Sequence, residues 1–264
     1  MSSHMRAGQD PDLHGKDQLA TLRDVAQVKL GFEDPNWYLQ RRSFNISIRA
    51  ETVRHFLGNA RHERILDVGC GDGSLSLPLL TADNRLTLLD MSETMLSIAR
   101  SRIPSELSSG VTIVNDTFAE APLSPASYDL IICVGVLAYV HNAHSFAEKV
   151  LSLSTPGGDV ILECTDSDHP ISILGRAFGA VRGLISRPRV PLVLHTSREV
   201  IDIFSRLGFS LRNVFRYSLP PPGVRRVLSQ TFQYKSVRTL YGCPKRNRMP
   251  WLGSECIYHF RRDV

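Results

Sequence analysis

Short apolar runs and amphipathic stretches alternate along this chain from about residue 64. The apolar runs, bounded by glycine or polar residues, predict buried strands at 64–68, 86–90, 111–115, 128–134 and 157–165. Stretches with helical periodicity predict helices at 74–81, 92–102, 143–154 and 196–207. This alternation predicts an α/β fold, in which helices cover both faces of a parallel sheet. Residues 256–260 predict a last strand that closes the sheet.

Four segments lie outside this repeat. Residues 1–15 are polar, contain glycine and proline, and are predicted to be disordered or tag-like. Residues 16–58 carry helical periodicity and predict an N-terminal helical cap, while 167–195 and 218–253 are insertions. Because insertions beside a ligand site often shape the substrate pocket, we expect them to cap a single domain over 16–264. The alternative is that they are surface excursions.

The first predicted strand runs into a glycine-rich loop at 69–73. Glycine allows positive φ and a close approach of the backbone to a ligand, so a strand, this loop and a helix start predict a nucleotide-like site. The loop region carries Asp67 and Asp72 and no nearby lysine. This favours a ligand with hydroxyls or a positive centre over a phosphate.

The next two strands also end in acidic residues. Asp90, 17 positions after Gly73, suits a pair of ribose hydroxyls; the alternative is that it caps the following helix. Asp116 can accept a hydrogen bond from the amine of an adenine ring, which Phe118 would cover. Since ligands of such sheets bind at the carboxyl ends of the strands, these acids indicate one site.

Composition and charge narrow the class of protein. The chain has 264 residues, 42% hydrophobic and 22% charged, as in ordinary soluble domains. Its five cysteines form no C-x-x-C pair, so we expect a reduced, cytoplasmic protein without a metal site. It has no apolar run long enough to span a membrane and no predicted secretory signal.

Charge is divided unevenly along the chain. Residues 1–166 hold 14 Lys and Arg against 21 Asp and Glu, whereas residues 167–264 hold 17 against 5. The basic C-terminal part is either a solvated surface or a surface that attracts an anionic substrate, a lipid or a nucleic acid.

Together these motifs resemble the class I S-adenosylmethionine-dependent methyltransferases. Ile65–Gly73 is similar to the first motif of that family, and Leu89–Ser92 to its second. Tyr128–Cys133 resembles the fourth-strand motif, and Leu153–Gly158 the turn before the fifth strand. His195–Phe209 resembles the helix before the sixth strand. The resemblance covers 60–217 and is poor at the N-terminus and in 218–253.

The resemblance implies a Rossmann-like, seven-stranded, mostly parallel sheet whose last strand is antiparallel. It also implies S-adenosylmethionine as cofactor, with S-adenosylhomocysteine as product. The glycine loop would lie along the methionine part, with Asp67 near its amino group. The cofactor-binding residues implied are Asp67, Gly69, Cys70, Gly71, Gly73, Asp90, Met91, Asp116, Thr117, Phe118, Val134 and Leu137, with a looser match at Tyr38 and Arg42.

Two rival functions use the same loop. A nicotinamide dehydrogenase has G-x-G-x-x-G, but here Ser74 occupies the third glycine position and Gly73 comes one residue early. The spacing therefore favours a methyltransferase. A protein that binds the cofactor without catalysis is the second rival, although no motif is damaged.

Methyl transfer is an in-line displacement that needs positioning, exclusion of water and, for some acceptors, a base. Tyr139 and His141 follow the fourth strand and are the predicted catalytic residues, with His141 able to act as a base near neutral pH. The alternative for His141 is a helix-capping or surface role. Weaker candidates near the end of the fifth strand are Glu163, Asp166, His169 and His195.

We expect methyl transfer to an O or N atom of a small-molecule acceptor, and an anionic acceptor would suit the basic C-terminal part. The alternatives are a lipid or quinone-like acceptor at a membrane surface, reached through a basic amphipathic helix near 171–189, or RNA; nucleic acid is disfavoured because no RNA-binding module is visible. We expect a monomer or homodimer. The predicted substrate-binding residues are Trp37, His195, Arg225, Arg226 and Tyr234.

Overall fold

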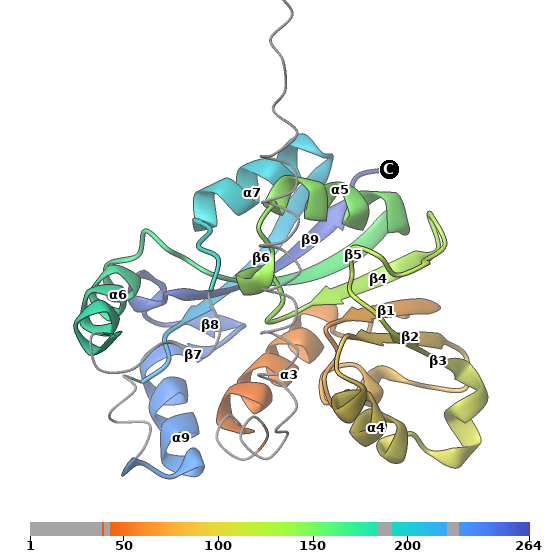
Figure 1. Ribbon diagram of the computed structural model, residues 1–264, viewed down its shortest axis with the longest axis horizontal. Helices are drawn as coiled ribbons and strands as arrows, with labels where there is room; N and C mark the ends of the chain where they lie inside the picture. The colour runs from red at the N-terminus through yellow and green to blue at the C-terminus, as the bar shows by residue number, and fades with distance from the viewer. Residues whose placement is uncertain (1–38, 40–42, 184–191, 221–226) are drawn as a thin grey trace, which may run out of the picture.

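The computed structural model describes residue 39 and residues 43–183, 192–220 and 227–264 (Figure 1). The sequence also predicts a helix at 16–31, which lies outside these ranges.

A seven-stranded sheet forms the centre of the molecule, in the order β3-β2-β1-β4-β5-β9-β6. β3, β2, β1, β4 and β5 pair in parallel, whereas β9 runs antiparallel to both of its neighbours, β5 and β6. This confirms the predicted sheet and its antiparallel last strand. The strands are β1 (Arg64–Val68), β2 (Arg85–Asp90), β3 (Val111–Asn115), β4 (Tyr128–Cys133), β5 (Ser154–Thr165), β6 (Phe209–Tyr217) and β9 (Glu255–Arg262).

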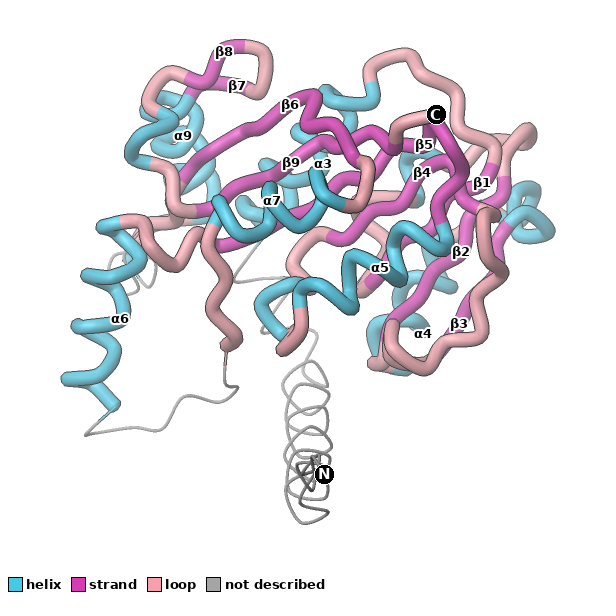
Figure 2. Tube along the Cα trace, turned by 90° about the horizontal axis from the view of Figure 1, so that it is seen from above, coloured by secondary structure: helices cyan, strands magenta, loops and turns pink. Residues whose placement is uncertain are grey.

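Helices cover both faces of this sheet, so the core has two halves (Figures 1 and 2). α5 (Ala143–Leu153) and α7 (Ser197–Arg206) pack on one face. α3 (Ser43–Leu57), α4 (Glu93–Arg102) and α9 (Gln230–Tyr241) pack on the other. The strands alternate between the two halves, since Leu66 joins the first and Ile65 the second.

The predicted helix at 74–81 is wrong. This segment forms turns and a short 3₁₀ helix at Leu77–Leu79. Pro78 has no N–H to donate, so a helix could not continue through it. The side chain of Ser76 instead turns inward and donates to Asp67 Oδ2 at 2.5 Å. The other three predicted helices are confirmed to within about a residue at each end.

The two insertions form structure of their own. α6 (Pro170–Gly183) follows β5 and stands at the side of the sheet (Figure 1). The second insertion contains α9, the short hairpin of β7 (Gly242–Cys243) and β8 (Arg246–Asn247), and a 3₁₀ turn at Pro250–Leu252. Within the described ranges, no helix combines the length and apolar character needed to cross a membrane.

Candidate active site

A cavity of about 370 Å³ opens at the carboxyl edge of the parallel strands. Its walls come from the ends of β1, β2 and β5, from the residues that follow β3 and β4, from α3, and from the first residue of β9. A cavity of this size at this edge is the usual ligand site of an open α/β sheet. The predicted site residues that line it are Gly69, Cys70, Gly71, Asp90, Met91, Asp116, Thr117, Phe118, Val134 and Tyr139.

The glycine loop after β1 forms the floor of the cavity. Gly69 and Gly71 have φ of +65° and +54°, a conformation that favours glycine. A Cβ at Gly69 would lie 2.5 Å from Val136 Cγ2, so a side chain there would collide with the turn after β4. The loop therefore needs glycine for both its conformation and its closeness to the opposite wall.

Asp90, the last residue of β2, is oriented by backbone N–H groups. Gly71 N donates to Asp90 Oδ2 at 2.8 Å, and Ser92 N donates to Oδ1 at 2.9 Å. Burial raises the pKa of Asp90, and these hydrogen bonds oppose that rise. The N-cap of α4 is Ser92, whose side chain accepts a hydrogen bond from Met95 N. Ser92, and not Asp90, therefore has the helix-capping role.

Asp67 lies beneath the loop and does not line the cavity. Asp67 as a whole is 3% exposed, and its carboxyl accepts a hydrogen bond from the Ser76 hydroxyl. Burial raises the pKa of Asp67 to about 7, the Ser76 hydrogen bond opposes the rise, and the charges of Asp90 and Asp72 add to it. Near pH 7 the protonated and the ionised forms of this carboxyl are therefore both populated.

The side of the cavity beyond β3 holds an aromatic ring in a fixed position. Phe118 packs against Phe146 of α5, with ring centroids 5.0 Å apart. Lys149 Nζ lies 5.3 Å from the centroid of the Phe118 ring. Asp116 accepts from the backbone N of Thr117 at 2.7 Å, which orients its carboxylate at the same wall. This wall can bind a planar ring that carries a hydrogen-bond donor.

A buried ion pair stands on the opposite side. Arg49 of α3 donates through Nε to Glu163 Oε1 at 2.9 Å, and its Nη2 lies 2.5 Å from Oε2. The Tyr217 hydroxyl adds a hydrogen bond to Glu163 Oε1 at 3.1 Å. Arg49 is not among the site residues predicted from the sequence. A charged residue between the apolar positions of a predicted helix is nevertheless a signal for a buried partner.

Other predicted site residues lie elsewhere. Asp67, Gly73, Leu137, His141, His195 and Tyr234 do not line the cavity. His141 is exposed on the turn after β4, whereas Tyr139 of the same turn reaches the cavity. Tyr234 donates to Glu51 at 2.8 Å, between α9 and α3. Trp37, Tyr38, Arg42, Arg225 and Arg226 lie outside the described residues.

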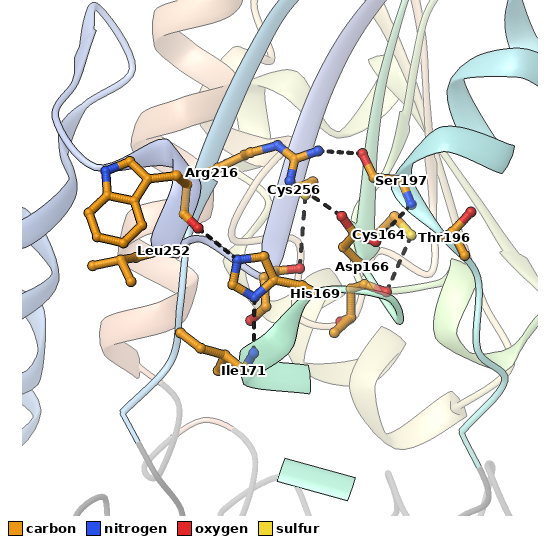
Figure 3. A network of polar contacts seen from close by, with 12 residues as sticks. Cys164, Asp166, His169, Ile171, Thr196, Ser197, Arg216, Leu252 and Cys256 are labelled. Atoms are coloured by element: carbon orange, nitrogen blue, oxygen red, sulfur yellow. Dashed lines mark hydrogen bonds and ion pairs between the residues drawn. The ribbon is translucent and has the colours of Figure 1, made fainter. Parts of the chain in front are cut away.

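Asp166 and His169 belong to a polar network just beyond the end of β5 (Figure 3), and His195 lies near it in the chain's next described segment. Asp166 accepts from Ser197 N at 3.1 Å and from Arg216 Nη1 at 3.3 Å, which ties the start of α7 to β6. His169 is hydrogen-bonded to the carbonyl of Trp251 at 3.0 Å. His195 lies 2.7 Å from the carbonyl of Val140. These contacts give the three residues structural partners away from the cavity.

The site also contains features suited to the methionine part of the cofactor. Carboxylates surround the glycine loop, and a positively charged sulfonium or ammonium is favoured beside them. Asp90 is held where ribose hydroxyls would meet it, and Phe118 where a base would stack. The donor set present therefore fits S-adenosylmethionine. In the described part of the chain, no three His, Cys, Asp or Glu side chains gather as a metal ion would require.

Comparisons with known proteins agree with this geometry. Residues 65–158 match a family model described as a methyltransferase domain. A ubiquinone biosynthesis O-methyltransferase from Bordetella avium is 32% identical over 197 residues, which cover 74% of this chain and 75% of that protein. The corresponding protein of Bordetella pertussis is 32% identical over 213 residues, covering 78% and 80%.

Solved structures share the fold. A methyltransferase from Thermotoga maritima, titled a possible histamine N-methyltransferase, has a TM-score of 0.61 at 18% identity and covers 88% of this chain and 95% of its own. Magnesium protoporphyrin IX methyltransferase from Synechocystis, with S-adenosylhomocysteine bound, has a TM-score of 0.58 at 20% identity and covers 85% of each chain.

The fold and the cavity thus define an enzyme that transfers a methyl group. The chain belongs to the class I S-adenosylmethionine-dependent methyltransferases. S-adenosylmethionine is its cofactor.

Proposed function

We propose that this enzyme transfers the methyl group of S-adenosylmethionine to an oxygen atom of a small, quinone-like acceptor. The observation that carries the proposal is the character of the cavity beyond the glycine loop. Ile46, Leu219 and Leu192 line that end, which suits an apolar, ring-shaped molecule. The relatives that share about a third of their residues with this chain are named for O-methylation in ubiquinone biosynthesis.

We assign the cofactor to the side of the cavity formed by β1, β2 and β3. Asp90 binds the ribose hydroxyls, and Asp116 and Phe118 bind the base. The glycine loop holds the methionine part, with Asp67 beneath its amino group.

The expectation of an anionic acceptor weakens with this assignment. It depended on Arg225, Arg226, Lys235 and Arg238; the first two lie outside the described residues, and Arg238 is ion-paired with Glu51. Arg49, the guanidinium that the described lining contributes, is already paired with Glu163. An uncharged acceptor with hydrogen-bonding hydroxyls fits this end of the cavity better.

Calorimetry with S-adenosylhomocysteine tests the cofactor site. We expect binding by the full chain and at least tenfold weaker binding by Asp90→Ala, a loss of about 1.4 kcal/mol. Transfer of a labelled methyl group to 4-hexylcatechol tests the acceptor. We expect a methyl ether as product; a protein that binds S-adenosylhomocysteine but methylates no phenolic probe would contradict the acceptor class.

A second candidate is an acceptor that resides in a membrane surface. Ile173 and Leu174 of α6 are 50% and 72% exposed, and Leu192 near the cavity is 59% exposed. Co-sedimentation with phosphatidylglycerol vesicles at low salt tests this version. Binding that Leu174→Ser weakens severalfold would support it, and no co-sedimentation would refute it.

A further inference from the structure

We propose that His195 is a positioning residue for the acceptor: it holds Leu192 at the mouth of the cavity, where Leu192 contacts an apolar substituent of the reacting ring. Leu192 is then the residue that determines which substituents the enzyme prefers. The inference rests on the proposed ring-shaped acceptor and names the residues that select its substituent. It gives a role to a histidine that the sequence predicts to bind the substrate and that does not line the cavity.

Residues 192–195 form a short segment at the carboxyl edge of the sheet. Val193 N donates to the carbonyl of Ala138, in the turn after β4, at 2.8 Å. The His195 carbonyl accepts from Ser167 N, just beyond the end of β5, at 2.9 Å. The segment is therefore tied to the residues that follow two neighbouring strands.

The side chain of His195 adds a third attachment, which is buried. His195 is 5% exposed, and its Nε2 lies 2.7 Å from the carbonyl of Val140. A carbonyl oxygen only accepts hydrogen bonds, so Nε2 carries the hydrogen and donates it. The other ring nitrogen, Nδ1, lies 3.9 Å from Glu199 Oε2 in the first turn of α7. With both nitrogens facing these groups outside the cavity lining, the imidazole acts on an acceptor only through the segment.

The segment leads directly into α7. Thr196 is the N-cap of this helix and forms a capping box with Glu199, which fixes the direction in which the chain enters the helix. His195 is the residue before this cap, and Leu192 is three residues earlier. Over so short a distance, a displacement of His195 moves Leu192 as well.

Leu192 lines the cavity although it is 59% exposed, which places it at the cavity mouth. Ala138 and Tyr139 of the attached turn line the same cavity. The hydrogen bonds of the segment therefore join two parts of one wall. Because the burial of apolar surface is favourable, an acceptor whose apolar substituent covers Leu192 binds better than one without it.

The test measures kcat and KM for 4-hexylcatechol and for catechol, which lacks the alkyl chain. Leu192→Ala should raise the KM for 4-hexylcatechol about tenfold with little change in kcat, as expected when a contact that does not change during the reaction is lost. For catechol, kcat/KM should stay the same. The selectivity, which is the ratio of the two kcat/KM values, should therefore fall about tenfold.

Two variants of His195 carry the same amide group at different reach. The longer side chain in His195→Gln can place its N–H near the position of the imidazole Nε2, whereas the shorter one in His195→Asn cannot reach the Val140 carbonyl. His195→Asn should lower the selectivity about tenfold, and His195→Gln should retain most of it. Combining His195→Asn with Leu192→Ala should cause no loss beyond that of either change alone, because both act on one contact.

His169→Asn is the control for a buried histidine that binds a carbonyl elsewhere. His169 is 9% exposed, and its Nε2 lies 3.0 Å from the carbonyl of Trp251. This variant should keep its selectivity within about twofold, even where urea unfolding shows that it is destabilised as much as His195→Asn. All variants should bind S-adenosylhomocysteine with a Kd within about twofold of that of the unaltered chain.

Three results would overturn the inference while leaving the proposed function intact. Unchanged selectivity in Leu192→Ala would mean that the substituent does not contact Leu192. Equal losses of selectivity in His195→Asn, His195→Gln and His169→Asn, or loss of S-adenosylhomocysteine binding in His195→Asn, would show that His195 serves only the fold. An unaltered chain that binds S-adenosylhomocysteine but methylates neither phenol would contradict the proposed function, and the inference with it.

Discussion

Asp67 makes the stability of the apoenzyme depend on pH. Its carboxyl is buried beneath the glycine loop, and burial raises its pKa from 3.8 to about 7. Between about pH 4 and 7 the folded chain holds this proton and the unfolded chain has released it, so stability falls as pH rises through that range. Well above pH 7, keeping the ionised Asp67 carboxylate buried lowers the free energy of unfolding by about 4 kcal/mol, at about 1.4 kcal/mol per pKa unit.

Asp67→Asn removes this cost, because an amide cannot ionise. Its carbonyl oxygen can still accept the Ser76 hydrogen bond. At pH 5 the unaltered chain bears only part of the penalty, and at pH 8 it bears nearly all of it. The stability of the variant relative to the unaltered chain should therefore increase by roughly 2 to 3 kcal/mol from pH 5 to pH 8.

Urea unfolding of both chains at the two pH values measures this difference. Asp83→Asn, which changes an exposed carboxylate in the turn before β2, serves as control and should shift stability by less than about 0.5 kcal/mol at either pH. A relative stability of Asp67→Asn that is the same at pH 5 and pH 8 would refute the reasoning, because it would mean that Asp67 ionises normally in the folded chain.

Three further predictions follow from the same cavity. S-adenosylhomocysteine should release up to about half a proton on binding at pH 7, measured by calorimetry in two buffers, and Asp67→Asn should abolish the release. Arg49→Met should cost about 3 to 5 kcal/mol in urea unfolding by leaving Glu163 charged and buried, and adding Glu163→Gln should recover part of that loss. Gly69→Ala should abolish S-adenosylhomocysteine binding in calorimetry, and Val136→Ala should not restore it, because the positive φ strains the alanine whatever the space.

Most of the sheet could be predicted because its inner parallel strands, β1, β2, β4 and β5, are largely buried on both faces. Their sequences are continuous apolar runs, and glycine or polar residues mark their ends. β1 to β4 follow this pattern closely, and β5 starts three residues before its predicted start. The helix predicted after the glycine loop, at 74–81, was wrong for a local reason. The apolar spacing of this segment is helical, but Pro78 cannot donate the hydrogen bond that a helix needs.

The cofactor side of the site was also accessible from the sequence. It is built from residues that immediately follow β1, β2 and β3, so chain position alone brings them to one edge. The site residues in the turn after β4 were harder to predict, because the backbone conformation of this short turn decides which side chain faces the cavity. Tyr139 lines the cavity, whereas His141, two residues later, does not.

The acceptor side could not be predicted in the same way, because its polar residues come together only through pairing across the whole chain. Arg49 and Glu163 are 114 positions apart, and each one alone is a charged residue in an apolar stretch. Glu255 illustrates a second reason. A search of the carboxyl ends of strands overlooks it, because β9 runs antiparallel and brings its first residue to that edge. In a sheet of this topology, the residue that begins the antiparallel strand lies at the same edge as the residues that end the parallel strands, so both can line one ligand site.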